Sequence, residues 1–239
     1  MIIASNLPRM GLIVGPPRVG YNAAMGQTLT VNEIFLSLQG EGLRTGMPCA
    51  FVRLAGCNLR CRWCDTTYAL TEGEEMELSD ILMRVGRLGC KRVEVTGGEP
   101  LIQKHTPELL RRFCDAGYET LLETNGSLDI STVDEPVVRI VDFKCPSSGE
   151  QDANCWANVE RLTSHDEVKF VIADRTDYDF ARDTVAERRL LEICPVTFQP
   201  VAGVCEPAKL AGWILSDGLD VRLGLQLHKI LWPGRKRGV

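Results

Sequence analysis

The sequence contains no apolar run of the roughly 18–20 residues that a membrane-spanning helix requires. Its first 26 residues hold a short apolar stretch that is broken by proline and arginine, unlike the core of a signal peptide. Basic charge is not in excess either, because 27 lysines and arginines face 32 aspartates and glutamates, for a net charge of −5. These absences argue against membrane, secreted and nucleic-acid-binding proteins, and they predict a cytoplasmic protein with a small-molecule ligand.

Histidine is scarce, with three residues, whereas cysteine is abundant, with ten. Disulfide frameworks are typical of small secreted domains, and a chain of 239 residues can bury a core without them, so we expect free thiols. Seven of the ten are scattered: Cys49, Cys90, Cys114, Cys145, Cys155, Cys194 and Cys205. All of these except Cys145 are predicted to serve as small buried apolar side chains.

The chain divides by composition into three parts. Residues 1–27 are rich in proline, glycine, asparagine and methionine without sustained periodicity, which predicts an N-terminal extension. Residues 28–233 carry the apolar patterns of one folded domain, and residues 234–239, GRKRGV, form a basic C-terminal tail.

Segments of strand length alternate with helix-like stretches along this domain. Strands are predicted over residues 30–35, 49–55, 92–97, 119–124, 139–144, 167–172, 196–200 and 220–227. Helices are predicted over residues 77–88, 106–117, 177–193 and 206–218, with Ser79, Thr106 and Asp177 as N-caps. Such alternation is typical of βαβ units with parallel strands.

Polar and glycine-rich stretches follow six of these strands at their C-terminal ends, as in GGEP (97–100), TNGS (124–127) and KCPSSG (144–149). In a barrel of parallel strands those ends form one catalytic face, whereas an open doubly wound sheet has a single crevice. Helix patterns are weak between the middle strands. The sequence therefore predicts an α/β fold, a partial and irregular (β/α) barrel with parallel strands.

Three cysteines, Cys57, Cys61 and Cys64, stand close together in GCNLRCRWCDTTY, residues 56–68. A zinc site would need a fourth Cys or His at similar spacing, and none follows. A thioredoxin-type pair would account for Cys61 and Cys64 but not for Cys57. Three thiolates on a four-iron cluster leave one iron open for a substrate or cofactor, which accounts for all three.

The run CNLRCRWC and the TGGEP that follows one βα unit later closely resemble the radical S-adenosylmethionine enzymes. In these enzymes the amino and carboxylate groups of the methionine moiety chelate the open iron. The resemblance implies a 4Fe-4S cluster held by Cys57, Cys61 and Cys64. Taken alone, GGEP would be an ordinary turn before a helix.

Further stretches resemble one family of this superfamily, the 7-carboxy-7-deazaguanine synthases. The matching segments are residues 35–66, 95–101, 123–127, 142–150, 198–201 and 225–233, with LQGEG and CDT as the most specific marks. Membership implies a lyase of queuosine or 7-deazapurine biosynthesis, which converts 6-carboxy-5,6,7,8-tetrahydropterin to 7-carboxy-7-deazaguanine with loss of ammonia by radical ring contraction. It also implies S-adenosylmethionine, a 4Fe-4S cluster and Mg²⁺ as cofactors, an electron donor such as flavodoxin or ferredoxin, and a homodimer.

Motif matching to this family assigns candidate site residues. Thr66 matches a ligand of Mg²⁺, an ion that prefers oxygen donors. The candidates for S-adenosylmethionine binding are Gly98, Cys145, Pro146, Ser147, Gln199, Pro200, Val201 and Ala202. The candidates for substrate binding are Leu38, Gln39, Gly40, Arg53, Thr96 and Pro233. The second-tier candidates are Glu41, Glu123, Asn125, Lys144 and His228.

Two segments depart from the family pattern. The family more often has Ser-Pro-Lys where this chain has Cys145, Pro146 and Ser147, so the side-chain chemistry there differs and backbone contacts are expected instead. Relatives can end at the position of Pro233 and contact substrate through a terminal carboxylate, whereas here the basic tail follows.

Several candidates also have a purely structural interpretation. Thr66 is well placed for a helix cap, Arg53 for an ion pair at a sheet edge and Glu41 for a solvated loop charge, and a lone histidine such as His228 is often structural. Two other functions compete with the synthase: an activase that makes a glycyl radical on a partner protein, and a non-catalytic iron–sulfur electron carrier. The carrier would require four protein ligands and no open iron.

Overall fold

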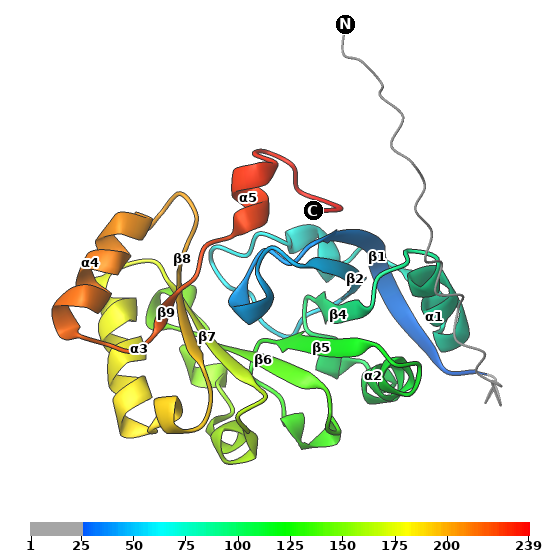
Figure 1. The fold of residues 1–239 in the computed structure, drawn as a ribbon, viewed down its shortest axis with the longest axis horizontal. Helices are drawn as coiled ribbons and strands as arrows, with labels where there is room; N and C mark the ends of the chain where they lie inside the picture. The colour runs from blue at the N-terminus through cyan, green and yellow to red at the C-terminus, as the bar shows by residue number, and fades with distance from the viewer. Residues whose placement is uncertain (1–25) are drawn as a thin grey trace, which may run out of the picture.

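We describe residues 26–239 in a computed structural model, so all but the last two residues of the predicted N-terminal extension lie outside the described residues (Figure 1). The strands in this range are β1 (Thr28–Leu38), β2 (Pro48–Leu54), β3 (Glu74–Glu77), β4 (Arg92–Gly97), β5 (Glu119–Thr124), β6 (Val138–Phe143), β7 (Glu167–Ile172), β8 (Val196–Pro200) and β9 (Arg222–Leu223). The α-helices are α1 (Leu78–Gly86), α2 (Thr106–Asp115), α3 (Arg175–Glu187), α4 (Pro207–Asp217) and α5 (Leu227–Leu231).

All of these strands form one sheet in the order β3-β1-β2-β4-β5-β6-β7-β8-β9. From β2 through β4 to β9 neighbouring strands are parallel, as predicted, and β3 and β9 are edges, so strand pairing does not close the barrel. The strand β1 differs because it runs antiparallel to both β2 and β3. It joins β2 through the short loop at residues 39–47, which is compatible only with antiparallel pairing.

The predicted helices are present, with small shifts at their ends. Ser79 and Thr106 lie within the first turns of α1 and α2, and α3 begins after Asp174, whose carboxylate accepts a hydrogen bond from the Asp177 amide at 3.0 Å. The predicted N-caps were therefore wrong by one to three residues. Apart from β6, the regular structure between β5 and β7 consists only of short 3-10 helices, which explains the weak helix patterns there. Among residues 26–239 no helix is long and apolar enough to span a membrane.

The helices α1 to α4 cover the outer face of the sheet, where two apolar clusters form. The first packs α1 and α2 against β1, β2, β4 and β5 through residues such as Val52, Val95 and Phe113. The second packs α3 and α4 against β6, β7 and β8 through residues such as Phe170 and Tyr178. Figure 1 shows these two helix pairs at opposite ends of the sheet.

The residues that alternate with these core positions face the inside of the partial barrel, because successive strand side chains point to opposite faces. Near the start of β5 and β6 this inner face is apolar, with a small cluster of Leu121, Val138 and Ile140. Closer to the C-terminal ends of the strands it is polar. We call the polar residues there the inner belt: Arg53, Glu94, Thr96, Glu123, Asp142, Lys169 and Gln199.

The segment after β9, residues 224–239, crosses from β8 to the hairpin of β1 and β2. The Gly224 amide donates to the Phe198 carbonyl at 2.9 Å, and the Leu227 amide donates to the Gly40 carbonyl at 2.9 Å. Figure 1 shows α5 above the strands, away from the other helices. Residues 220–227 were predicted as a strand, but only Arg222–Leu223 pair as one and Leu227 begins α5.

Candidate active site

The three clustered cysteines lie in the loop that follows β2, at the C-terminal end of the strands. All three thiols are half-buried, whereas Cys49, Cys145, Cys194 and Cys205 are buried. The Cys57 sulfur accepts hydrogen bonds from the Leu59 amide at 3.4 Å and the Asn125 amide group at 3.8 Å. Such bonds tune sulfur ligands of iron–sulfur clusters. The loop thus presents its thiols at the surface of the catalytic end.

The donor set of the cysteine loop is three thiols, Cys57, Cys61 and Cys64. Residues 26–239 hold no group of three Cys, His, Asp or Glu side chains placed to bind a single metal ion. A structural zinc site would take a fourth Cys or His ligand, whereas an iron–sulfur cluster binds each thiolate through a different iron and can leave one iron open. By its chemistry, a set of three thiolates fits such a cluster.

The GGEP motif fastens the cysteine loop to the sheet. A Cβ on Gly98 would lie 2.2 Å from the Gly56 carbonyl oxygen, so only glycine fits there. Glu99 is buried. Its carboxylate accepts hydrogen bonds from the Thr124 hydroxyl at 2.9 Å and from the backbone N–H of Asn125 at 2.6 Å. Burial raises the pKa of Glu99 despite these bonds. The motif thereby positions Asn125, which reaches Cys57.

The 145–147 segment uses its side chains for structure. The Ser147 hydroxyl and amide both donate to the Asp177 carboxylate, the amide at 2.8 Å, and the Cys145 thiol is buried. Asp177 also accepts from the Ala173 amide at 2.8 Å, so it holds this segment to the start of α3. Contacts between the backbone of this segment and a ligand stay a prediction.

A buried lysine organises the inner belt. The Lys169 ammonium lies 2.9 Å from Glu41 and 3.8 Å from Asp142, and it also bonds Glu123. Burial would lower the pKa of Lys169, but these carboxylates outweigh it and the pKa lies well above its usual range. Burial likewise opposes ionisation of Glu41, but Lys169 outweighs it and lowers the pKa of Glu41 to about 2. The interpretation of Glu41 as a solvated charge was therefore wrong.

A second buried carboxyl, Glu94, behaves in the opposite way. Its side chain is 2% exposed and accepts a hydrogen bond from the Gln39 amide group. Burial, followed by repulsion from Glu123, raises the pKa of Glu94 well above its usual value. Glu94 therefore remains neutral over a wider pH range than its neighbours and holds Gln39 against β4.

Two buried acceptors of the inner belt have no hydrogen-bond partner among residues 26–239: Oδ1 of Asp142 and Oε1 of Gln199. The other oxygen of Asp142 accepts from Lys144 at 2.8 Å. Buried polar atoms are nearly always paired in native proteins, because leaving one unpaired costs about 1–3 kcal/mol. These two atoms are thus the clearest mark of a ligand with hydrogen-bond donors.

Arg53 lies at the edge of the inner belt beside β1. Its Nε donates to the Glu33 carboxylate at 2.9 Å, and its guanidinium lies 6.0 Å from the centre of the Phe35 ring. Within the described residues, its two terminal nitrogens make no hydrogen bond to protein. The proposed ion pair exists, and it leaves the outer edge of the guanidinium available.

Three further candidates are Thr66, His228 and Pro233. Thr66 makes no helix-capping bond, and its hydroxyl lies 3.7 Å from the Cys64 sulfur. His228 lies in α5 rather than at a strand end, and a Cβ on Gly40 would lie 2.3 Å from its Nδ1. Burial lowers the pKa of His228. Pro233 is exposed beyond α5.

The other candidates lie near the strand ends. Leu38 and Pro146 are half-buried, Pro200 and Val201 are buried, and Ala202 is exposed. The residues that sequence reasoning missed are Glu94, Asp142, Lys169, Asp177 and Gln226, whose amide group donates to Glu41 at 2.8 Å. A signal existed for three of them, because Glu94, Asp142 and Lys169 are charged residues flanked on both sides by apolar residues within predicted strands.

Comparison with known proteins places this geometry in a family. The family model of the radical SAM superfamily matches residues 52–142. The chain is 44% identical over 226 residues to a 7-carboxy-7-deazaguanine synthase of Koribacter versatilis, which covers 88% of this chain and 100% of the relative. It is 47% identical over 214 residues to the synthase of Chlorobaculum tepidum, at 88% and 97% coverage.

A solved structure shares the fold. The crystal structure of QueE from Escherichia coli superposes with a TM-score of 0.70 at 23% identity, and the match covers 85% of this chain and 96% of that chain. Together with the identity to the curated relatives over nearly their whole length, this establishes that the chain belongs to the 7-carboxy-7-deazaguanine synthase family of radical S-adenosylmethionine enzymes.

Proposed function

We propose that the inner belt is the site at which this chain binds 6-carboxy-5,6,7,8-tetrahydropterin and contracts its ring to 7-carboxy-7-deazaguanine with loss of ammonia. The enzyme is a radical S-adenosylmethionine lyase by family. The observation that carries the site assignment is the pair of unpartnered buried acceptors, on Asp142 and Gln199, beside the three-cysteine loop. A reduced pterin offers several N–H donors that would satisfy such acceptors.

Cys57, Cys61 and Cys64 would hold the 4Fe-4S cluster, which together with S-adenosylmethionine supplies a 5′-deoxyadenosyl radical when both are bound. Gly98 keeps the cysteine loop in contact with β4, and Asn125 donates to Cys57. The 145–147 backbone and the 199–202 segment follow β6 and β8 at the same end of the sheet, and we assign them to the nucleoside part of the cofactor. The cysteine loop is therefore anchored to the strand ends near Cys57.

The substrate residues divide by charge. Glu41, Glu123 and Asp142 offer side-chain oxygens that Lys169 holds together, and these acceptors suit the N–H groups of the pterin. Arg53 suits the substrate carboxylate, because a guanidinium can bind a carboxylate through two parallel hydrogen bonds. Thr96, Gln39 and Leu38 would complete the pocket, and Gly40 leaves room for His228.

The Thr66 hydroxyl is the candidate protein ligand for Mg²⁺. It has no role as a helix cap, and the half-buried hydroxyl lies in the loop beside the cysteines. Magnesium commonly takes few protein oxygens and completes its shell with water and substrate. We further propose, from the family resemblance, a homodimer in the cytoplasm that receives electrons from flavodoxin or ferredoxin.

The test is anaerobic incubation of the reconstituted, reduced enzyme with 6-carboxytetrahydropterin, S-adenosylmethionine and Mg²⁺, followed by mass spectrometry. We expect 7-carboxy-7-deazaguanine, and no product when unsubstituted tetrahydropterin replaces the substrate. Uncoupled 5′-deoxyadenosine and methionine alone would mean that the substrate is another one, as for an activase. Neither product from an intact cluster would favour an electron carrier.

A further inference from the structure

The basic tail, residues 234–239, docks against the β1 side of the site. The Lys236 carbonyl oxygen lies 3.1 Å from the Tyr68 hydroxyl and shares its one hydrogen with a carboxylate, and the Arg237 guanidinium pairs with Glu72 at 2.7 Å. The same guanidinium lies 4.3 Å from the centre of the Tyr68 ring. These contacts join residues that are more than 160 positions apart, so the tail is part of the folded domain.

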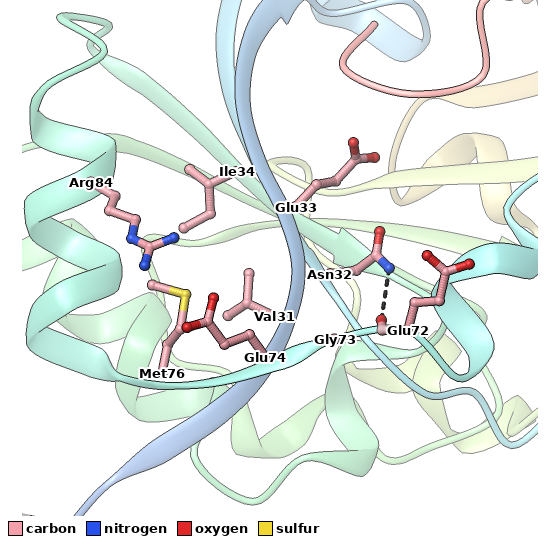
Figure 2. Close-up of a pocket in the computed structure, with 9 residues that line it drawn as sticks. All are labelled: Val31, Asn32, Glu33, Ile34, Glu72, Gly73, Glu74, Met76 and Arg84. Carbon is pink, nitrogen blue, oxygen red and sulfur yellow. Dashed lines mark hydrogen bonds between the residues drawn. The ribbon is translucent and has the colours of Figure 1, made fainter.

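Glu33 connects this tail to the inner belt. Its carboxylate accepts from the Gly238 amide at 3.1 Å, from the Tyr68 hydroxyl at 3.0 Å and from Nε of Arg53 at 2.9 Å. Figure 2 shows the Glu33 side chain on β1 pointing toward the C-terminal segment. Glu33 is mostly buried, at 16% exposure, so the tail amide replaces solvent as a partner of the carboxylate.

The bond to Nε fixes the orientation of the Arg53 guanidinium. A guanidinium held through Nε presents its two terminal nitrogens as a fork, which matches the two oxygens of a carboxylate. Those nitrogens make no hydrogen bond within the described residues. Any shift of Glu33 would therefore change where the fork of Arg53 points.

We propose that the tail is a positioning element for substrate binding: Arg237 and Gly238 hold Glu33 and Tyr68 in place, and Glu33 aims Arg53 at the substrate carboxylate. The inference rests on the proposed function, because it requires a substrate with a carboxylate. Within the described part of the chain, the tail makes no hydrogen bond or ion pair to the cysteine thiols or to the inner belt. In this proposal the tail affects only the binding of the substrate carboxylate.

Two substitutions separate the contacts of the tail. Gly238→Pro removes the backbone N–H that donates a hydrogen bond to Glu33. Proline also cannot adopt the φ of +64° at this position. Arg237→Ala removes the pair with Glu72 and the stacking on Tyr68. The matched control is Arg111→Ala, because Arg111 also pairs with one glutamate and its side chain is 56% exposed against 51% for Arg237.

The measurement is the dissociation constant of two ligands by anaerobic calorimetry on the reconstituted enzyme with S-adenosylmethionine: 6-carboxytetrahydropterin and tetrahydropterin without the carboxylate. We expect both tail variants to bind the carboxylated ligand about five- to tenfold more weakly, the scale of one ordinary hydrogen bond, because Arg53 stays in place and loses only its alignment. The other ligand should bind equally to wild type and variants. In turnover, KM should rise by a similar factor with kcat nearly unchanged.

Equal affinity of wild type and both variants for the carboxylated ligand would overturn the inference. An equal loss for both ligands, or lower iron content in the variants, would also overturn it, because the tail would then be merely structural. These outcomes differ from failure of the proposed function, in which wild type itself would neither bind nor convert 6-carboxytetrahydropterin. Arg237→Lys, which keeps the pair with Glu72, should recover part of the affinity.

Discussion

The two faces of the same strands have opposite compositions. On β7 and β8, Phe170 and Phe198 lie on the outer face, fully buried with ring centres 5.8 Å apart. The residues next to them in sequence, Lys169 and Gln199, face inward, where one is a buried ion and the other leaves an acceptor unpaired. Because successive side chains of a strand point to opposite faces, one residue can stabilise the core while its neighbour in sequence lines the site.

The outer face stabilises the fold at little functional cost. Burying a large apolar side chain contributes about 1.5–3 kcal/mol, and the aromatic cluster around Tyr178 and Phe198 adds edge-to-face contacts at 5.9 Å. The inner face does the reverse, since buried charges and unpaired acceptors cost free energy in the absence of ligand. Sites that are arranged for a ligand are often less stable without it.

The largest expected effect concerns the cysteine loop, which belongs to neither face. Cys61→Ala should abolish product formation and iron binding, since three thiolates are needed for the cluster, yet leave circular dichroism unchanged because the loop lies outside both apolar clusters. Cys114→Ala, which removes a half-buried thiol on α2, is the control and should retain activity. Full iron content in Cys61→Ala would contradict the ligand assignment.

The next largest effect concerns the contribution of the inner face to the free energy of unfolding. Lys169→Met leaves the half-buried Glu41 and Glu123 without their counterion, so we expect a loss of about 3 kcal/mol, the lower end for a broken buried pair, in the free energy of unfolding, measured by urea titration. Lys104→Met, at an exposed lysine, should change little. Adding Glu123→Gln to Lys169→Met should restore stability in part but not activity. A cost below 1 kcal/mol would show that Lys169 does not hold these carboxylates.

A smaller effect concerns the buried acid of the inner face. The pKa of Glu94 is raised in the folded state, so its contribution to stability is full below the ordinary value of 4.5 and is lost as pH rises toward the folded pKa. Glu94→Gln mimics the neutral acid and should gain on wild type with rising pH, by about 1 kcal/mol for each pKa unit crossed. Thermal unfolding of the ligand-free protein at pH 5 and pH 8 checks this.

The pKa of Glu41 is lowered in the folded state, to about 2, so its stabilising contribution is fully present above 4.5 and is lost only as pH falls toward 2. The contribution of Glu41 is therefore the same at pH 5 and pH 8, and the difference in thermal unfolding between Glu94→Gln and wild type does not depend on it. A gap between Glu94→Gln and wild type that stays constant, or that shrinks with rising pH, would contradict a raised pKa at Glu94.

Much of this arrangement could be predicted from the sequence, because its signals are local. The spacing of Cys57, Cys61 and Cys64, the GGEP turn and the apolar runs of β4 to β8 depend on near neighbours, and the partial barrel follows from them. The alternation of strand residues also predicts faces. Applied to EVKFVI and RVEVTG, it would have identified Lys169 and Glu94 as inward polar residues.

The rest depends on contacts between distant parts of the chain. Asp177 is suited to a helix cap by sequence, yet Asp174 caps α3 and Asp177 instead holds Ser147, thirty residues earlier. The docking of Gly238 on Glu33 joins opposite ends of the domain and leaves no local pattern. The antiparallel direction of β1 likewise follows from a hairpin whose alternation resembles that of any half-buried strand.

The most direct test of the division between faces uses one adjacent pair on β8, Gln199→Leu and Phe198→Leu, with affinity for 6-carboxytetrahydropterin and S-adenosylmethionine measured alongside the unfolding midpoint. Gln199→Leu removes an unpaired acceptor, so we predict a near-normal midpoint and binding of at least one ligand weakened about tenfold or more. Phe198→Leu should lower the midpoint and leave affinity of the folded enzyme unchanged. Normal binding in Gln199→Leu, or ligand loss confined to Phe198→Leu, would contradict the account.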